Sequence, residues 1–349
     1  MPVTVIVGAQ FGSEGKGKLV AYLARSDGSD FAVRCGGSNA GHSFTYKGKL
    51  YLLRHIPCGI TNPATRLLIA PGAFVNPEVL VHEIEETGVT PDRLGIDRFT
   101  AIISNEHLVR ERRLGLDAQI SSTLSGTGAA TSMKVLRNWQ LRFAKDLPIL
   151  EPFLTDVSSE LNIAYDEGKK ILIEGTQGFG LSLHHSRYYP YCTSRDTTAA
   201  AFLSEVGLSP RCVDGIFMVV RTFPIRVPGS SGPLQQETTW EEITTSSGAP
   251  DPIVEITSVT RRIRRVGNFE EEFVFRAAQI NRPTGIAIHG IDYIDFSDKG
   301  KRRFEDLSCA AKDFIAKVEK LTQAPALFIY TGPDTGDIID RRGDSSSHR

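Results

Sequence analysis

The sequence predicts an α/β fold in which helices flank a mostly parallel β-sheet. Short apolar runs recur along the whole 349-residue chain, and polar or helical stretches separate them. This alternation is typical of sheets whose strands are joined by helical crossovers. Functional loops of such sheets gather at the carboxyl ends of the parallel strands. The segments that follow the apolar runs are therefore the candidate functional loops.

The predicted strands are short and uncharged, and several are rich in β-branched residues, as expected for buried parallel strands. They are residues 3–7, 31–33, 67–70, 101–103, 171–173, 216–220, 286–288 and 326–330. The clearest helix covers 304–321, where apolar residues recur at helical spacing.

The length and composition favour one elaborated domain. A chain of 349 residues can bury a large core, and neither an internal repeat nor a Pro/Ser-rich linker divides it. We expect the domain to cover 1–340 and the polar tail 341–349 to be flexible.

Charge and cysteine usage exclude several classes of protein. Forty basic and forty-one acidic residues give a net charge of -1, so no global field indicates binding to nucleic acid or an anionic membrane. The five cysteines are scattered without metal-ligand spacing, which favours reduced thiols and a cytosolic protein. We expect neither export nor membrane spanning, because residues 1–2 form no leader pattern and no apolar run approaches the length that spans a membrane.

The segment 8–18, Gly-Ala-Gln-Phe-Gly-Ser-Glu-Gly-Lys-Gly-Lys, follows the first predicted strand. Its glycines let backbone N–H groups approach an anion, and Lys16 and Lys18 supply countercharge, so it is interpreted as a phosphate cradle. The spacing departs from the usual P-loop because Gly17 stands where the magnesium-binding hydroxyl would be. A glycine-rich turn with solvated lysines is the alternative.

Four further segments could carry chemistry. Residues 35–42 resemble a second anion loop with Asn39 and His42, and a plain turn explains them equally well. Residues 174–180 place Gln177 at a loop end, although a surface turn is the commoner meaning. The basic run 261–265 suits carboxylate or phosphate recognition, against a solvated face. Residues 330–334 form a good turn that could also lie under a nucleotide base.

The histidines outside this set give no metal signal. His55, His82, His107 and His348 have no companion at ligand spacing. The adjacent pair 184–185 points in different directions on any regular element, so a metal site there is not expected.

Taken together and in this order, the motifs resemble those of the adenylosuccinate synthetase family. Residues 11–18 match its signature WGDEGKGK except at the first and third positions, and 36–42 is similar to its GGNNAGH loop. The resemblance continues through 126–128, 174–178, 189–194, 262–265 and 331–334, and therefore spans nearly the whole chain. The chain is shorter than the usual family member, chiefly in the helical region at about 135–170.

The resemblance implies the family's fold, a P-loop-related sheet, and its two-step chemistry. A nucleotide γ-phosphoryl group is first transferred to the 6-oxygen of a purine nucleotide, and the amine of aspartate then displaces phosphate. By resemblance, the catalytic residues are Ser13, His42 and Gln177, with His42 as general acid and Gln177 near the 6-position. Mg²⁺ would be bound by the Gly41 carbonyl and at Ser13.

The binding residues also follow from the resemblance. For the ATP-type donor they are Gly12, Glu14, Gly15, Lys16, Gly17, Lys18, Gly41, His42, Ser43, Asp292, Thr331, Gly332 and Pro333. For the purine monophosphate they are Ser13, Asn39, Thr123, Arg137, Gln177, Thr193 and Val227, with Arg137 reaching across a homodimer. For L-aspartate they are Ser13, Thr260, Arg262 and Arg264. Ile263 interrupts the run of arginines that the family has at this place.

Ser13 is the more important of two departures from the family pattern. It stands where the family has a catalytic aspartate, and a neutral hydroxyl does not replace a carboxylate base. A shorter side chain leaves room for the 2-amino group of guanine. The change resembles the phage-type members that make N6-succino-2-amino-2′-deoxyadenylate from dGMP, on the route to 2,6-diaminopurine DNA. We therefore expect a ligase for dGMP and L-aspartate.

The second departure is Gly290, which replaces the lysine of the family's guanine-reading TKLD segment. We accordingly expect ATP or dATP as donor, as in the phage-type members. Two alternatives remain open: an ordinary adenylosuccinate synthetase acting on inosine monophosphate with GTP, and a silent nucleotide-binding protein. The expected location is the cytoplasm, that of the host if the protein is phage-encoded.

Overall fold

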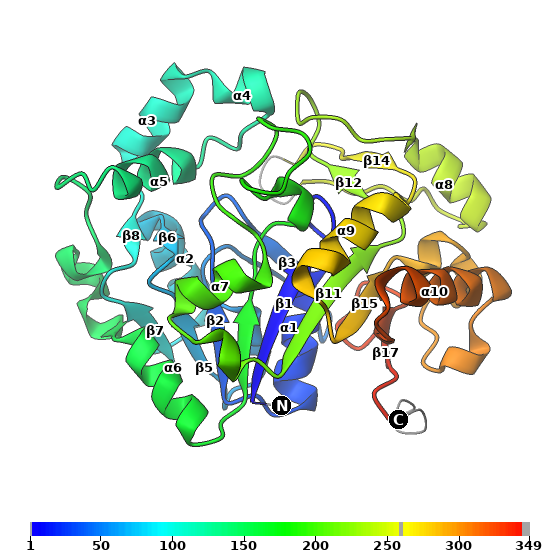
Figure 1. Ribbon diagram of the computed structural model, residues 1–349, viewed down its shortest axis with the longest axis horizontal. Helices are drawn as coiled ribbons and strands as arrows, with labels where there is room; N and C mark the ends of the chain where they lie inside the picture. The colour runs from blue at the N-terminus through cyan, green and yellow to red at the C-terminus, as the bar shows by residue number, and fades with distance from the viewer. Residues whose placement is uncertain (1, 258–260, 344–349) are drawn as a thin grey trace.

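A ten-stranded mixed β-sheet forms the centre of the protein (Figure 1). The structure, a computed structural model, describes residues 2–257 and 261–343. In spatial order the strands are β17 (Ile338–Asp340), β16 (Ala326–Tyr330), β15 (Gly285–His289), β11 (Gly215–Arg221), β1 (Val3–Gly8), β10 (Ile171–Glu174), β2 (Phe31–Arg34), β5 (Arg66–Ile69), β7 (Leu94–Asp97) and β9 (Leu154–Thr155). β17 runs antiparallel to β16, and the other neighbours are parallel.

Helices cover both faces of this sheet. They are α1 (Lys16–Ser26), α2 (Pro77–Thr87), α3 (Asn105–Arg113), α4 (Leu116–Ile120), α5 (Thr127–Val135), α6 (Val157–Asp166), α7 (Ala199–Val206), α8 (Trp240–Ser247), α9 (Glu271–Asn281) and α10 (Cys309–Thr322). Successive residues of a strand point to opposite faces. Val5 and Val7 accordingly pack in the apolar cluster of α6, α7, α9 and α10, and Ile6 packs in that of α1 and α2.

Smaller sheets extend the molecule around the central one. They are the hairpin β3 (His42–Tyr46) and β4 (Lys49–Leu53), the pair β6 (Phe74–Val75) and β8 (Ala101–Ile102), and the sheet β12 (Ile225–Arg226), β14 (Arg265–Gly267) and β13 (Glu237–Thr238). In Figure 1 the chain enters β1 at the bottom, while α3 to α5 and the β12–β14 region lie above the upper, carboxyl ends of the central strands. These segments form the walls of the site described below.

The predicted α/β class with a single domain is confirmed. Each predicted strand is present, although 101–103 forms β8 of a two-stranded sheet outside the central one. The predicted helix 304–321 is wrong at its start. Phe304–Asp306 forms a separate 3₁₀ turn, and α10 begins at Cys309 because the Ser308 hydroxyl caps it by accepting from the Ala311 N–H.

The structure describes residues 341–343 of the predicted flexible tail. Arg342 pairs with Asp27 and Asp340, and Arg341 pairs with Glu319, so these first tail residues are attached to the domain. Residues 344–349 lie outside the described residues. Among the helices of 2–257 and 261–343, none has the length and apolar character needed to cross a membrane.

Candidate active site

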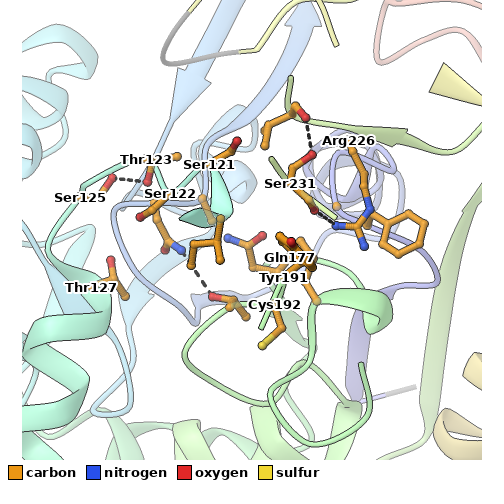
Figure 2. Close-up of a pocket in the computed structure, with 18 of the residues that line it drawn as sticks. Ser121, Ser122, Thr123, Ser125, Thr127, Gln177, Tyr191, Cys192, Arg226 and Ser231 are labelled. Carbon is orange, nitrogen blue, oxygen red and sulfur yellow. Dashed lines mark hydrogen bonds between the residues drawn. The ribbon is translucent and has the colours of Figure 1, made fainter. Parts of the chain in front are cut away.

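A cavity of about 520 Å³ opens beyond the carboxyl ends of the central strands (Figure 2). Of the residues expected from the sequence to form a site, twelve line it: Gly12, Ser13, Lys16, Asn39, Gly41, His42, Thr123, Gln177, Thr193, Val227, Arg262 and Arg264. The fold thus brings segments from seven separate parts of the chain to one place. Thr260 lies outside the described residues.

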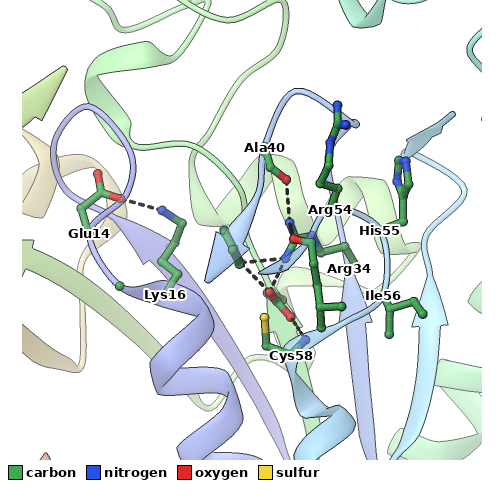
Figure 3. A network of polar contacts seen from close by, with 12 residues as sticks. Glu14, Lys16, Arg34, Ala40, Arg54, His55, Ile56 and Cys58 are labelled. Atoms are coloured by element: carbon green, nitrogen blue, oxygen red, sulfur yellow. Dashed lines mark hydrogen bonds and ion pairs between the residues drawn. The ribbon is translucent and has the colours of Figure 1, made fainter. Parts of the chain in front are cut away.

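The glycine-rich loop between β1 and α1 is closed by a buried carboxylate. Glu14 is fully buried, and its Oε1 accepts hydrogen bonds from the backbone N–H groups of Gln10 (3.1 Å) and Gly12 (2.8 Å). Its Oε2 accepts from Lys16 Nζ at 2.6 Å (Figure 3). Glu14 therefore holds the backbone of the loop in place and orients Lys16, which faces the cavity.

Ser13 is an exposed residue held in an uncommon backbone conformation. Its φ of 56° lies in the left-handed region, which non-glycine residues seldom occupy. Arg221 Nη1 donates a hydrogen bond to the Ser13 carbonyl at 2.8 Å and so fixes this turn. Within the described residues the Ser13 hydroxyl has no hydrogen-bond partner and faces the cavity, where it can meet a ligand.

His42 takes part in a buried polar network at the ends of β2 and β10 (Figure 3). Glu174 Oε1 lies 2.5 Å from His42 Nδ1 and is ion-paired with Arg34, while its Oε2 accepts from the Cys58 N–H at 2.7 Å. Arg34 Nη1 also lies 2.7 Å from His42 Nδ1, and Arg34 Nη2 donates to the Ala40 carbonyl at 2.9 Å. The network fixes the imidazole ring and the loop that carries it.

The environment of His42 keeps its imidazole neutral in the free protein. Burial, reinforced by the positive charge of Arg34, lowers the pKa of His42 to about 4, although Glu174 acts in the opposite direction. Burial alone would raise the pKa of Glu174, but Arg34 and His42 outweigh it and lower that pKa to about 2. An anionic group placed beside His42 would favour its protonated form, which is the condition for a general acid.

The sequence analysis missed Arg34, and it did not identify Glu174 as the carboxylate partner of His42 and Arg34. The sequence did offer an indication, because each of these charged residues ends an apolar strand. In the structure β2 pairs with β10, and Arg34 lies opposite Glu174. His42, Cys58 and Glu174 also place possible ligand atoms within 4.8 Å of one another. Because the guanidinium of Arg34 already pairs with Glu174, a metal ion is disfavoured there.

Lys18, which was also expected to bind donor phosphates, does not line the cavity. Its Nζ donates to the carbonyls of Gly332 (2.6 Å) and Asp337 (3.0 Å) and lies 4.6 Å from the ring centre of Tyr330, away from the cavity. Burial lowers the pKa of Lys18 to about 7, although the negative charge of Asp337 acts in the opposite direction. Side chains two positions apart on the first helical turn point in different directions, so Lys16 faces the cavity and Lys18 faces the segment 331–337. In this structure Lys18 ties α1 to the segment 331–337.

The remaining residues expected to hold the donor lie outside the cavity lining. Gly15 and Gly17 form the loop and the first turn of α1, and Ser43 is exposed on β3. Asp292 is buried, which raises its pKa to about 6, and Thr331 and Gly332 are buried beside exposed Pro333. Gly290, with φ 86°, precedes Asp292, and a Cβ there would lie 2.7 Å from Thr222 Oγ1.

The basic run divides its side chains between the cavity and the protein. Arg262 and Arg264 line the cavity. Arg265 turns away, donating to Ser231 Oγ (3.1 Å) and the Gly232 carbonyl (2.8 Å) and pairing with Glu237. The alternation places two forked cations on one wall, a geometry suited to carboxylate binding.

Other parts of the lining carry neutral hydrogen-bonding groups. Asn39 Nδ2 lies 3.5 Å from Thr193 Oγ1, and the hydroxyls of Thr123 and Ser125 are 2.7 Å apart (Figure 2). Gln177, with φ 64°, lies at the centre of the lining in Figure 2. Arg137 is exposed after α5 and does not reach this cavity within its own chain.

A glycine-rich strand-to-helix loop, a buried histidine and two arginines around one cavity define a nucleotide-dependent enzyme of the α/β class. The comparisons with known proteins identify the family. The sequence pattern of adenylosuccinate synthetase matches residues 5–147 and 139–301. The adenylosuccinate synthetase of Thermococcus sibiricus is 43% identical over 346 residues, which are 98% of this chain and 99% of that protein. The chain belongs to the adenylosuccinate synthetase family, and it is a ligase that forms a carbon–nitrogen bond.

Two solved structures are similar over nearly the whole chain. The fully ligated adenylosuccinate synthetase of Plasmodium falciparum has a TM-score of 0.84 at 23% identity, covering 98% of this chain and 100% of that one. The succinoaminodeoxyadenylate synthetase of cyanophage S-2L, bound to dGMP and to dATP as energy donor, has a TM-score of 0.82 at 25% identity, covering 97% and 95%. The short length is shared with the Thermococcus relative.

Proposed function

We propose that this protein joins L-aspartate to dGMP, forming N6-succino-2-amino-2′-deoxyadenylate while ATP or dATP is hydrolysed to the diphosphate and phosphate. The observation that carries the proposal is Ser13, which stands at the aspartate position of the family motif and lines the cavity. The cyanophage structure supports it, because that protein has the same fold and is described with dGMP and dATP bound.

Ser13 suits guanine for a steric and a chemical reason. Guanine carries a 2-amino group beside N1, and serine leaves more room there than aspartate does. The Ser13 hydroxyl is without a partner in the described residues and is available to accept a hydrogen bond from that amino group. Gln177, which lines the same cavity, would contact the base near its 6-position.

The second candidate is the ordinary reaction of inosine monophosphate, L-aspartate and GTP. The sequence relatives favour it over the dGMP reaction, because the Thermococcus protein and others at about the same identity are all named adenylosuccinate synthetase. The two candidates share the ligase chemistry and differ in the purine and the donor. Ser13 and Gly290 argue for the first candidate, and the names of the relatives argue for the second.

The roles proposed for the phosphoryl-transfer residues follow from their surroundings. Lys16, oriented by Glu14, would bind a donor phosphate. The neutral His42 would take a proton when anionic phosphates reach it, and then stabilise the transferring group and donate to it. Glu174 would hold the protonated imidazolium through Nδ1. The resulting 6-phosphoryl group makes the purine 6-oxygen a good leaving group for the attacking amine.

Family members use Mg²⁺ with a nucleoside triphosphate, and the residues of this chain fit that ion. Mg²⁺ prefers oxygen ligands and commonly takes a few from protein with others from phosphates. The Gly41 carbonyl and the Ser13 hydroxyl are oxygen donors in segments that line the cavity. When bound, the ion supplies neutralisation of charge on the transferring phosphates.

The aspartate and oligomer proposals use the remaining residues. Arg262 and Arg264 would clamp the carboxylates of L-aspartate, together with Thr260.

We also expect a homodimer, in which Arg137 contacts the monophosphate of the partner subunit. The exposed apolar side chains beside Arg137 support this, because Val135, Leu136 and Trp139 are 73%, 68% and 89% exposed in the isolated chain.

One assay separates the candidates. Purified protein is incubated with Mg²⁺, L-aspartate, each purine monophosphate and each triphosphate while phosphate release is followed. We expect turnover with dGMP and with ATP or dATP, and poor turnover with inosine monophosphate, which lacks the amino group that Ser13 would bind. Turnover with inosine monophosphate and GTP alone would establish the second candidate.

Variants of Ser13 sharpen the assay. Ser13→Ala should reduce kcat/KM for dGMP much more than it weakens ATP binding. Ser13→Asp should restore the family carboxylate and shift preference towards inosine monophosphate. If the ratio of kcat/KM for the two purines is the same in the wild type and both variants, Ser13 does not select the base.

A further inference from the structure

Arg221, the last residue of β11, is a buried cation that neither the motifs nor the proposed roles above use. Its side chain is 2% exposed. The Gln10 side chain fixes its backbone, since the Arg221 N–H donates to Gln10 Oε1 (2.8 Å) and Gln10 Nε2 donates to the Arg221 carbonyl (3.1 Å). Arg221 is therefore anchored to the central sheet and to the glycine-rich loop at once.

The guanidinium of Arg221 reaches three separate segments of the site. Nη1 donates to the Ser13 carbonyl at 2.8 Å, and it lies 3.1 Å from Nδ1 of His289, the residue before Gly290. Nη2 is ion-paired with Glu255. Burial acts against the charge of Arg221, but Glu255 outweighs it and raises the pKa of the guanidinium. The cation is thus permanent.

Glu255 continues the connection to the aspartate wall. Its Oε1 accepts from Tyr293 Oη at 3.0 Å. Its backbone carbonyl accepts from the N–H of Arg264 at 2.9 Å, and the next residue, Ile256, pairs with Ile263 in a β-bridge. Glu255 is thereby attached by its backbone to the strand-like segment that carries Arg262 and Arg264.

We propose that Arg221 is a positioning residue that couples the purine subsite to the aspartate subsite. It holds Ser13 in its left-handed turn and, through Glu255, holds the segment that presents Arg262 and Arg264 to the cavity. An arginine fork can satisfy several acceptors at fixed angles, and lysine has a single nitrogen for them. Binding of a monophosphate against Ser13 and binding of aspartate against Arg264 therefore strengthen each other. This inference rests on the proposed assignment of the two subsites.

The test measures that coupling directly. Isothermal titration gives the Kd of dGMP with and without saturating L-aspartate for the wild type, Arg221→Lys, Glu255→Gln and the double variant. We expect aspartate to tighten dGMP binding in the wild type, and the ratio of the two Kd values to approach one in each variant. The double variant should lose no more than either single variant, because both break one connection. The kcat should fall at least tenfold, while the KM for ATP changes less than the KM for aspartate.

A matched arginine controls for a general loss of stability. Arg66 pairs with Glu160 at the amino end of β5, remote from the cavity, and both side chains are 24% exposed. Arg66→Lys should leave the ratio of Kd values at the wild-type level. Should Arg221→Lys fail to fold, Glu255→Gln supplies the same readout with the cation retained.

Two outcomes would overturn the proposal. One is a wild-type protein whose affinity for dGMP is the same with and without aspartate. The other is a folded Arg221→Lys or Glu255→Gln protein with an undiminished ratio. If inosine monophosphate proves to be the substrate, the titrations are repeated with it, because the contacts of Arg221 do not involve the 2-amino group. Failure of the base assignment is then distinct from failure of the coupling.

Discussion

The two halves of the cavity are built differently. On the side proposed for phosphoryl transfer, Lys16 and His42 line the cavity, and Arg34 and Glu174 form the network that holds His42; each of these residues is at most 8% exposed and has a charged or polar partner in the protein. On the acceptor side, defined by Ser13, Asn39, Thr123 and Arg262, the side chains are half-buried or exposed, and the hydroxyl of Ser13 has no partner in the described residues.

The difference in burial separates groups that are oriented before the substrate arrives from groups that the substrate itself can order. Groups that stabilise charge in a transition state are most effective when they are oriented before the substrate arrives. The phosphoryl side meets this condition through its buried ion pairs. Groups that select a substrate can instead be ordered by that substrate, and the acceptor side retains open polar groups for it. Variants on the two sides should therefore fail in different ways.

The largest expected effect is on turnover at the phosphoryl side. His42→Asn removes the proton donor while keeping a polar side chain of similar size, and kcat should fall by about 10²- to 10⁴-fold. Steady-state kinetics at saturating substrates measure it. The KM for aspartate should change little. A kcat within threefold of the wild type would mean that His42 is not the general acid.

The next effect is on stability. Glu174→Gln keeps the shape of the side chain but leaves the buried cation Arg34 without its carboxylate, and it should lower the free energy of unfolding by about 3 to 5 kcal/mol. Urea unfolding followed by circular dichroism measures it. Glu272, which pairs with Arg187 on the surface, supplies the control, because Glu272→Gln should leave the midpoint unchanged. Equal midpoints for both variants would show that the buried pair of Arg34 and Glu174 stabilises the fold no more than a surface pair does.

The pH dependence of stability follows from the same buried groups. The folded pKa of His42, about 4, lies below the unfolded value of 6.5, so the unfolded chain takes up a proton that the folded protein does not. The free energy of unfolding should fall as the pH drops from about 7 to about 4. His289, with pKa about 3, and His55 act in the same direction. His42→Asn should make the decline shallower, whereas an unchanged slope would exclude His42 as a contributor.

The smallest effect is expected at the aspartate wall. Arg264→Ala should raise the KM for aspartate by about ten- to a hundredfold, the loss of one charge-assisted contact. The free energy of unfolding should change less than in Glu174→Gln. Arg265→Ala is the matched control, because Arg265 turns to Ser231 and Glu237 and should leave that KM near the wild-type value. Equal increases in the KM for aspartate in both variants would show that the arginines of residues 261–265 act together as a diffuse basic patch.

The sequence predicted the central strands well because burial on both faces imposes continuous apolar runs. It also predicted which loops meet, since parallel strands bring their carboxyl ends to one edge. The orientation of individual side chains could not be read in this way. Lys16 and Lys18 look equivalent in the motif, yet the turn of α1 sends them to different places. The pairing of Arg34 with Glu174 depends on the register of β2 against β10, which joins residues 140 positions apart.

The turn at Gly290 limits which side chains could replace this glycine over evolutionary time. Its φ of 86° disfavours any side chain, and the first carbon of one would lie 2.7 Å from the Thr222 hydroxyl that donates to the Gly290 carbonyl. A lysine at 290 alone therefore strains the backbone and displaces a hydrogen bond before it can contact a guanine. The path to such a residue needs Thr222 to change first or together with it. Positions 222 and 290, which directly follow the adjacent strands β11 and β15, therefore constrain each other's substitutions.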